Sequence, residues 1–131
     1  MTIESFDVGF VSATDALVHF YADVLELPGL EPRVFPMGTV HRLQCGPGVL
    51  KVMVPNDQPA PLPPTTSFWE RSGIRYATMW VDDVRAVVDR WRVHGGIVVM
   101  EPFELRAGVT TALVVDPDGN TVEVMCDASP R

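Results

Sequence analysis

One glutamate stands inside an otherwise apolar stretch close to the end of the chain. Glu123 lies in the sequence Thr-Val-Glu-Val-Met, which follows the turn sequence Asp-Pro-Asp-Gly-Asn at 116–120. Alternation along an extended strand puts Glu123 on one face together with Thr121 and Met125. Burying a carboxylate among apolar residues is costly, so we expect Glu123 to have a hydrogen-bond or ion-pair partner or a functional role. Glu123 is therefore the first candidate for chemistry, either as a general base or as the anchor of a ligand.

The same pattern occurs earlier in the chain with the opposite charge. The sequence Val-Leu-Lys-Val-Met at 49–53 aligns with Thr-Val-Glu-Val-Met at 121–125. The shift is 123 − 51 = 72 residues, and it puts Lys51 at the position of Glu123. Lys51 is also the only lysine among the 10 basic residues. The sequence therefore indicates two copies of one unit, with opposite charges at equivalent sites.

The rest of the sequence predicts how each copy folds. In the first repeat, about residues 1–54, a strand is followed by an amphipathic helix at 14–26 and by three short strands. Residues 55–73 form a linker rich in proline. The second repeat, about 74–131, has the same order with its helix at 83–94. The eight strands are expected at about 5–11, 32–36, 39–45, 49–54, 76–81, 97–103, 109–115 and 120–126. The predicted fold class is α+β, a single domain of two βαβββ repeats.

Two such sheets, each with its helix on the outer face, would form an eight-stranded cup with a free inner groove. The first strands of the repeats align at a shift of 69 residues, which sets Tyr76 against Asp7. Such grooves, with aromatic walls and a few polar groups, are the usual form of a small-molecule site. Phe68 and Trp69, just beyond the proline-rich part of the linker at 55–67, would either close over the groove or pin the loop to the body. Alternation places the following residues in the groove: Asp7, Lys51, Tyr76, Trp80, Thr121, Glu123 and Met125.

Composition narrows the classes of protein. The chain has 131 residues, 47% hydrophobic and 21% charged, as in an ordinary globular domain. Its formal net charge of −7 argues against nucleic-acid and anionic-membrane partners and would suit a cationic ligand. No apolar run reaches the ~18 residues of a membrane span, and the first residues lack the pattern of a signal peptide. We therefore expect a cytoplasmic protein, with Cys45 and Cys126 reduced.

Three segments resemble one known superfamily. The sequences at 20–29, 81–96 and 116–125 are similar to the vicinal oxygen chelate superfamily, which includes glyoxalase I, extradiol dioxygenases and bleomycin-resistance proteins. The resemblance covers nearly the whole chain and both repeats. It implies the fold described above and a homodimer, because members of this length usually pair. It does not choose a function, since the superfamily contains several chemistries and some proteins that are not enzymes.

Enzymes of this superfamily hold a divalent metal on the first and last strands of each unit. Glu123 matches the metal-ligating Glu, whereas Tyr76 stands where His is usual and Lys51 where Glu is common. The remaining ligand position, on the first strand of the first unit, falls on Phe6 in a gapless alignment and on Asp7 by strand alternation. We follow the alternation, because the gapless alignment would put Asp7 on the helix side and bury its charge in the core. Lysine and tyrosine are poor ligands for these cations, so we expect no metal cofactor, with a divalent metal left open.

Three functions compete for this chain. The first is metal-free binding or sequestration of an aromatic or cationic ligand. The second is a metal-independent isomerase or lyase, with Asp7 or Glu123 as general base beside the ammonium of Lys51. The third is a divalent-metal lyase or dioxygenase with altered ligands. His41, on a middle strand of undetermined facing, is a further ligand-binding candidate. Asp7, Lys51 and Glu123 would equally form a structural ion cluster in which the opposite charges compensate each other, so whether the chain is an enzyme stays open.

Overall fold

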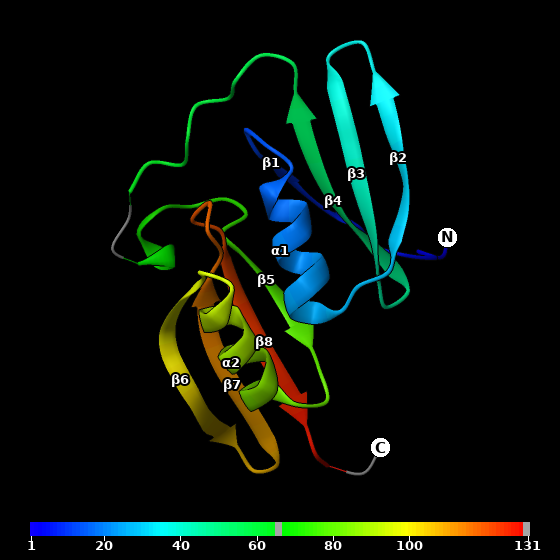
Figure 1. Cartoon of the computed structure of the whole chain (residues 1–131). Coiled ribbons are helices and arrows are strands. Elements are labelled where there is room, and N and C mark those ends of the chain that lie inside the picture. Colours follow the sequence, from blue (N-terminus) through cyan, green and yellow to red (C-terminus); the bar gives the residue numbers. More distant parts are fainter. Residues whose placement is uncertain (65–66, 130–131) are drawn as a thin grey trace. The chain divides into compact units, whose positions relative to one another are not determined.

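The computed structural model describes residues 1–64 and 67–129, which form two compact units (Figure 1). Module one is Met1–Pro61 and module two is Leu62–Arg131. The division falls inside the predicted linker. Each module contains a four-stranded sheet and one α-helix, in the order βαβββ. The prediction of an α+β fold built from two βαβββ repeats is therefore confirmed.

Module one has its helix on one face of the sheet. In the sheet the strands lie in the order β1-β4-β3-β2, with β1 parallel to β4 and the other pairs antiparallel. The helical stripe expected from the sequence is confirmed, because four of its residues are buried: Leu17, Phe20, Tyr21 and Val24. The elements are β1 (Val8–Val11), α1 (Ala16–Leu25), β2 (Gly29–Phe35), β3 (Gly38–Cys45) and β4 (Gly48–Pro55).

The segment between α1 and β2 differs from the sequence prediction. The helix ends before Glu26, which adopts a left-handed conformation with φ of 54°. Pro28 lies close behind, and proline cannot continue a helix. β2 then begins at Gly29, three residues before the expected start near residue 32, because a bulge between Leu30 and Arg33 carries the strand past Pro32. Proline has no N–H for the ladder, and such a bulge is where a strand tolerates it.

Module two repeats this arrangement. Its strands lie in the order β5-β8-β7-β6, with β5 parallel to β8. Asp83 caps α2, because its carboxylate accepts a hydrogen bond from the backbone N–H of Ala86 at 3.0 Å. Trp91 is fully buried under the helix and donates from Nε1 to the backbone oxygen of Val115 at 2.8 Å. The elements are a 3₁₀ turn η1 (Phe68–Glu70), β5 (Tyr76–Trp80), α2 (Val84–Val93), β6 (Ile97–Arg106), β7 (Val109–Val115) and β8 (Thr121–Asp127).

The Asp-Pro-Asp-Gly-Asn sequence forms the hairpin turn between β7 and β8, as predicted. The buried carboxylate of Asp116 accepts from the backbone N–H groups of Asp118 and Asn120, both at 2.9 Å. Gly119 has φ of 97°, a region that glycine adopts without strain. Asp116, the first residue of this turn sequence, is therefore a structural side chain that organises the turn.

Each sheet has one face that packs on its helix and one face that does not, which we call the open face. In module one, Leu50 and Val52 are buried on the helix side, so the alternating Lys51 belongs to the open face. In module two, Val122 and Val124 are buried on the helix side, so Glu123 belongs to the open face. Strand alternation thus assigns Lys51 and Glu123 to the faces that were predicted.

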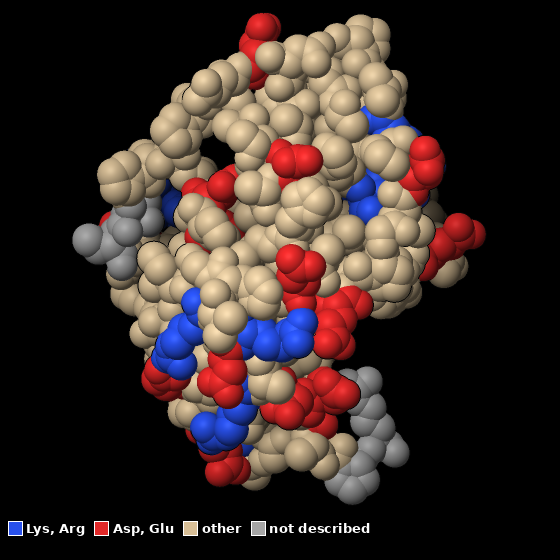
Figure 2. Space-filling view, in the orientation of Figure 1, with Lys and Arg blue, Asp and Glu red and all other residues tan. Residues whose placement is uncertain are grey.

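The outward side of α2 is a surface of mixed charge. Figure 2 shows Lys and Arg interspersed with Asp and Glu over this part of module two. One ion pair here joins Arg92 of α2 to Glu101 of β6. Exposed pairs of this kind contribute little to stability. Among the residues described, neither helix is long and apolar enough to cross a membrane.

Candidate functional site

The open face of module two centres on the carboxylate of Glu123. β5 and β8 run in parallel and bring three pairs of residues side by side: Tyr76 with Thr121, Thr78 with Glu123, and Trp80 with Met125. The hydroxyl of Thr78 donates a hydrogen bond to Oε1 of Glu123 at 2.8 Å. This bond fixes the direction of a half-buried carboxylate and leaves its second oxygen available to a ligand.

Two aromatic rings flank this carboxylate. Tyr76 and Trp80 are the diagonal neighbours of Glu123 on the parallel strand β5, because they lie two residues on either side of Thr78, which pairs with Glu123. Each of the two aromatic residues is 51% exposed. Met125 is 5% exposed and lies beside Trp80, so it supports the ring from the sheet rather than facing solvent. A carboxylate between two exposed aromatic rings is an arrangement that attracts organic cations.

An apolar pocket of about 350 Å³ adjoins the carboxylate. Its sheet side includes Leu113 and Thr121; Leu113 pairs directly with Glu123, and Thr121 lies two residues before it. Among the described residues, the lining contains one acid, Asp118, and no Lys or Arg. The lining residues are Leu62, Pro63, Pro64, Ser67, Phe68, Trp69, Ile97, Val99, Leu113, Val115, Asp118, Gly119 and Thr121.

Phe68 and Trp69 belong to this pocket. They lie in the 3₁₀ turn η1 near the end of the linker, where the sequence suggested an irregular loop. Their rings meet edge to face at 5.2 Å between centroids, and Phe68 also meets Tyr76 at 5.1 Å. Trp69 is 70% exposed. Phe68, Trp69 and Tyr76 thus form one aromatic cluster, of which Phe68 and Trp69 line the pocket.

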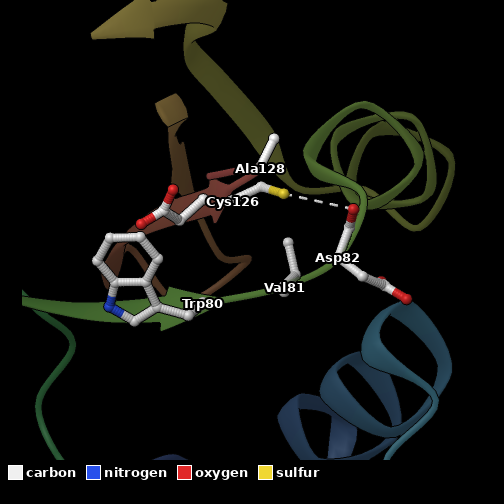
Figure 3. Close-up of a pocket in the computed structure, with 6 residues that line it drawn as sticks. Trp80, Val81, Asp82, Cys126 and Ala128 are labelled. Carbon is white, nitrogen blue, oxygen red and sulfur yellow. Dashed lines mark hydrogen bonds between the residues drawn. The ribbon is translucent and has the colours of Figure 1, made fainter. Parts of the chain in front are cut away.

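A shallow hollow of about 490 Å³ lies at the ends of β5 and β8 (Figure 3). Trp80 and Asp82 line it from one strand end and Cys126 from the other. The thiol of Cys126 donates to the backbone oxygen of Asp82 at 3.4 Å. This contact ties the two strand ends together, and it assigns Cys126 a structural role. The same hollow exposes one side of the Trp80 ring to solvent.

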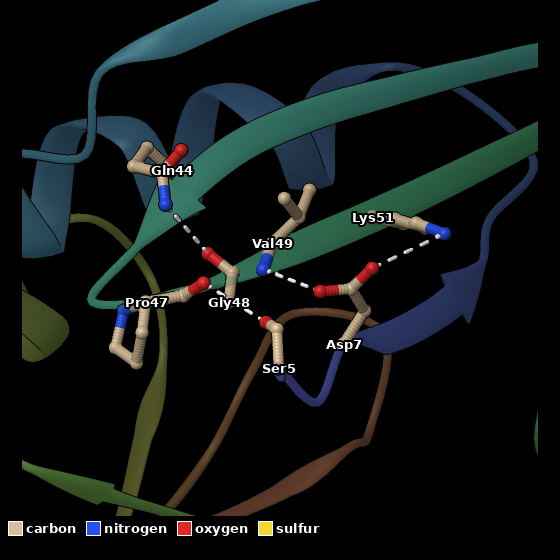
Figure 4. A network of polar contacts seen from close by, with 7 residues as sticks. All are labelled: Ser5, Asp7, Gln44, Pro47, Gly48, Val49 and Lys51. Atoms are coloured by element: carbon tan, nitrogen blue, oxygen red, sulfur yellow. Dashed lines mark hydrogen bonds and ion pairs between the residues drawn. The ribbon is translucent and has the colours of Figure 1, made fainter. Parts of the chain in front are cut away.

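The open face of module one carries an ion pair at the equivalent position. Nζ of Lys51 lies 3.5 Å from Oδ2 of Asp7, and the backbone N–H of Val49 donates to the other oxygen of that carboxylate at 2.8 Å (Figure 4). Ser5 donates to the backbone oxygen of Pro47 at 2.9 Å and completes the attachment of the N-terminal segment. The expected first strand at about 5–11 is shorter in the structure, so Asp7 lies just before β1, with its carboxylate at Lys51 of the open face.

His41 lies away from these groups. It pairs with the buried Val52, and it alternates with Leu43, which is also buried on the helix side. Its ring therefore belongs to the face opposite the one that bears Lys51. The sequence did not determine which face of the sheet His41 occupies, and in the structure it is the face that packs on the helix. Nearby at the end of β3, burial raises the pKa of the Cys45 thiol, which keeps it protonated and unreactive at neutral pH.

Sequence reasoning did not single out Thr78 or the aliphatic wall of the pocket. The hydrogen bond of Thr78 depends on the parallel register of β5 and β8, and no short turn reveals that register. A usable indication was present for Thr78, because alternation already placed it with Tyr76 and Trp80 on one face. For Ile97 and Val99 the sequence showed only an apolar strand, which does not distinguish a core face from a pocket wall.

A comparison with known proteins identifies the family of the chain. The model of the Glyoxalase/Bleomycin resistance protein/Dioxygenase superfamily matches residues 8–124. The chain belongs to this superfamily, the one that the sequence resemblance named.

Individual relatives are distant in sequence. A protein named "Probable lactoylglutathione lyase" from Synechocystis sp. is 27% identical over 128 residues, which cover 92% of each chain. The structure of a glyoxylase/bleomycin resistance protein/dioxygenase domain from Frankia sp. EAN1pec has a TM-score of 0.75 at 14% identity, covering 97% of this chain and 98% of that one. The structure of TioX from Micromonospora sp. ML1 has a TM-score of 0.66 at 22% identity, covering 96% and 98%. The two structural likenesses establish the fold.

The residues present do not fit the divalent metal that this fold implies. At the family's ligand positions the chain has Asp7, Lys51, Tyr76 and Glu123. The carboxylate of Asp7 accepts from a backbone N–H and faces an ammonium, and that of Glu123 accepts from Thr78. A lysine ammonium has no lone pair to give a metal and repels a cation. The donor set is therefore unsuited to the octahedral or tetrahedral sites that divalent metals form.

Proposed function

We propose that this protein binds or sequesters a small molecule with a planar aromatic body and a positive charge, without a metal. One observation carries the proposal: the carboxylate of Glu123 lies between the exposed rings of Tyr76 and Trp80 and beside an apolar pocket without basic residues among those described. A cation would meet the carboxylate and the faces of the two rings. The aromatic body would enter the pocket, where Phe68 and Trp69 form one wall.

Ethidium, a planar aromatic cation, tests this proposal by titration calorimetry, with uncharged phenanthridine as the neutral probe of the same ring system. We expect ethidium to bind more tightly than phenanthridine. Glu123→Gln keeps the shape of the side chain and the bond from Thr78 but removes the charge. It should weaken ethidium binding by roughly tenfold or more, the equivalent of ~1.4 kcal/mol. Glu4→Gln, the same change at an exposed position of module one, is the matched control.

The aromatic rings are tested separately. Trp80→Leu should weaken ethidium by a smaller factor, since a cation–π contact at an exposed site contributes about 0.5–1 kcal/mol. Equal affinities for ethidium and phenanthridine, or no loss in Glu123→Gln, would contradict the proposal. The expected homodimer is tested on the same samples by light scattering coupled to size-exclusion chromatography.

A second candidate is a metal-independent isomerase or lyase in which Glu123 is the general base. It is favoured by the hydrogen bond from Thr78, which holds the carboxylate in one orientation, and by the Synechocystis relative. Formation of lactoylglutathione from glutathione and a small 2-oxo aldehyde would support it. Activity that is lost in Glu123→Gln and resists EDTA would favour this candidate over ligand sequestration.

Metal dependence has its own measurement. Protein purified without chelator should carry far less than one equivalent of zinc, nickel, iron or manganese by elemental analysis. EDTA should leave the melting temperature unchanged, because a metal that binds only the folded state would otherwise stabilise it. One tightly held equivalent, lost together with activity, would instead indicate a divalent-metal lyase or dioxygenase.

A further inference from the structure

A second charged surface lies on the open face of module one. The tight turn between β3 and β4 sets Arg42 directly opposite Lys51. Directly opposed side chains on antiparallel strands have Cβ atoms about 4.5–5.5 Å apart, and like charges there are destabilising. Arg33 belongs to the same face, because it pairs with Val40, two residues before Arg42. Three of the chain's 10 basic residues therefore lie on one face of one sheet.

These cations are only partly neutralised. Among the residues described, Lys51 alone of the three has an ion pair with a carboxylate, that of Asp7. Nη1 of Arg42 donates to the backbone oxygen of Glu31 at 3.3 Å, which leaves further guanidinium N–H donors available. Counting these three cations and Asp7, the local surplus is 3 − 1 = 2 positive charges, in a chain whose formal net charge is −7. A positive surface on an acidic protein selects for an anion.

Apolar side chains border the opposed pair. Val40 and Met53 face each other next to it on the same two strands, and Leu30 of β2 pairs with Arg42 on the other side. All three are half-buried, so their side chains still offer apolar area to a ligand. A simple inorganic anion would use only the charges of this surface. An organic anion would contact both the charged groups and the apolar side chains beside them.

We propose that the open face of module one binds an organic carboxylate with an apolar body, its carboxylate held between Arg42 and Lys51. The planar guanidinium of Arg42 suits a bidentate contact with the two carboxylate oxygens. Lys51 keeps Asp7 on one side and turns toward the bound anion on the other. The bound anion removes the repulsion between the two opposed cations. This ligand is opposite in charge to the one proposed for module two.

Sodium benzoate is the probe, titrated into the full-length, ¹⁵N-labelled protein and followed by NMR. We expect saturable shifts of backbone amides in β3 and β4 around Arg42 and Lys51. Benzamide has the same shape without the charge and should cause no saturable shift there. Inorganic phosphate has the charge without the apolar body and should bind more weakly than benzoate.

Arg42→Gln should weaken benzoate binding by roughly tenfold, the equivalent of one charge-assisted hydrogen bond. It should keep or raise the melting temperature, because it removes one of two opposed like charges. Arg85→Gln, the same change at an exposed position of α2, should retain the wild-type affinity. The proposal is overturned if benzoate does not saturate, if benzamide gives the same shifts, or if Arg42→Gln binds as tightly as the wild type. If phosphate bound as tightly as benzoate, the proposed contact between the apolar body of the ligand and this surface would be overturned.

Discussion

The two open faces occupy equivalent places in the repeated fold and carry opposite chemistry. In module one the last strand presents Lys51, which contacts Asp7, the residue just before the first strand. In module two the last strand presents Glu123, which accepts a hydrogen bond from Thr78 of the first strand. Both contacts join the last strand of a module to its first strand or to the residue just before it. The scaffold therefore conserves a contact between strands while the charge at that contact is reversed.

The surroundings of the two positions differ as much as the charges do. Beside Lys51 the neighbouring strand supplies another cation, Arg42. Beside Glu123 it supplies Leu113, and the exposed rings of Tyr76 and Trp80 lie on the diagonal. The comparison teaches that the repeated backbone sets where side chains converge, whereas the ligand class is decided by a few residues on the open faces. Membership of the superfamily alone would not distinguish these two surfaces.

Gly48→Ala should have the largest effect on stability and should act on module one only. A Cβ at this position would collide with the backbone oxygen of Phe6, where the N-terminal segment crosses the β3–β4 turn. We expect the free energy of unfolding to fall by roughly 1–3 kcal/mol, as in overpacked sites. Gly29→Ala is the control, since no heavy atom lies within 4 Å of its added Cβ. Chemical denaturation measures both, and equal effects of the two changes would contradict the collision.

Thr78→Val should cost more stability than Asp7→Asn. The first removes a donor to the half-buried Glu123, with an expected loss of about 1 kcal/mol. The second breaks an ion pair whose side chains are 42% and 37% exposed, with an expected loss below about 1 kcal/mol that shrinks as salt is added. Thr78→Ser keeps the hydroxyl and should restore most of the stability. A larger and salt-independent loss in Asp7→Asn would reverse the comparison.

The double-mutant cycle of Lys51→Met and Glu123→Gln should give the smallest effect. The sequence repeat led us to expect that the two opposite charges compensate each other. Because Lys51 pairs with Asp7 and Glu123 accepts a hydrogen bond from Thr78, each within its own module, we expect the effects of the two changes to add within roughly 0.3 kcal/mol. Unfolding curves of the two single mutants and the double mutant measure it. A coupling energy above roughly 0.5 kcal/mol would instead show that the two charges compensate each other.

Local patterns predicted much of this fold. The stripe of apolar residues gave α1, and the turn sequence at 116–120 gave the β7–β8 hairpin. The same reasoning could have reached Arg42. The two-residue turn Gly46-Pro47 pairs Cys45 with Gly48, and counting back three residues on each side sets Arg42 against Lys51.

Other features were beyond the reach of local patterns. The bond from Thr78 to Glu123 joins residues 45 positions apart through a parallel pairing, and no turn fixes the register of such a pair. The wall of the pocket in module two combines the linker residues Leu62 and Pro63 with strands far away in sequence. Periodicity describes one strand at a time, so it identifies the face of Leu113 but not the linker residues that cover it.

The pairing of first with last strands has a consequence for the order in which the chain folds. β1 pairs with β4 through residues such as Gly9 and Lys51, which are 51 − 9 = 42 positions apart. Among the described strands, none pairs outside its own module. The first sheet therefore remains incomplete until β4 has been synthesised, and from then on its ladder needs no later residue. We expect module one to fold on the ribosome while the second sheet is still being made, with slow closure of the parallel pair as its limiting step.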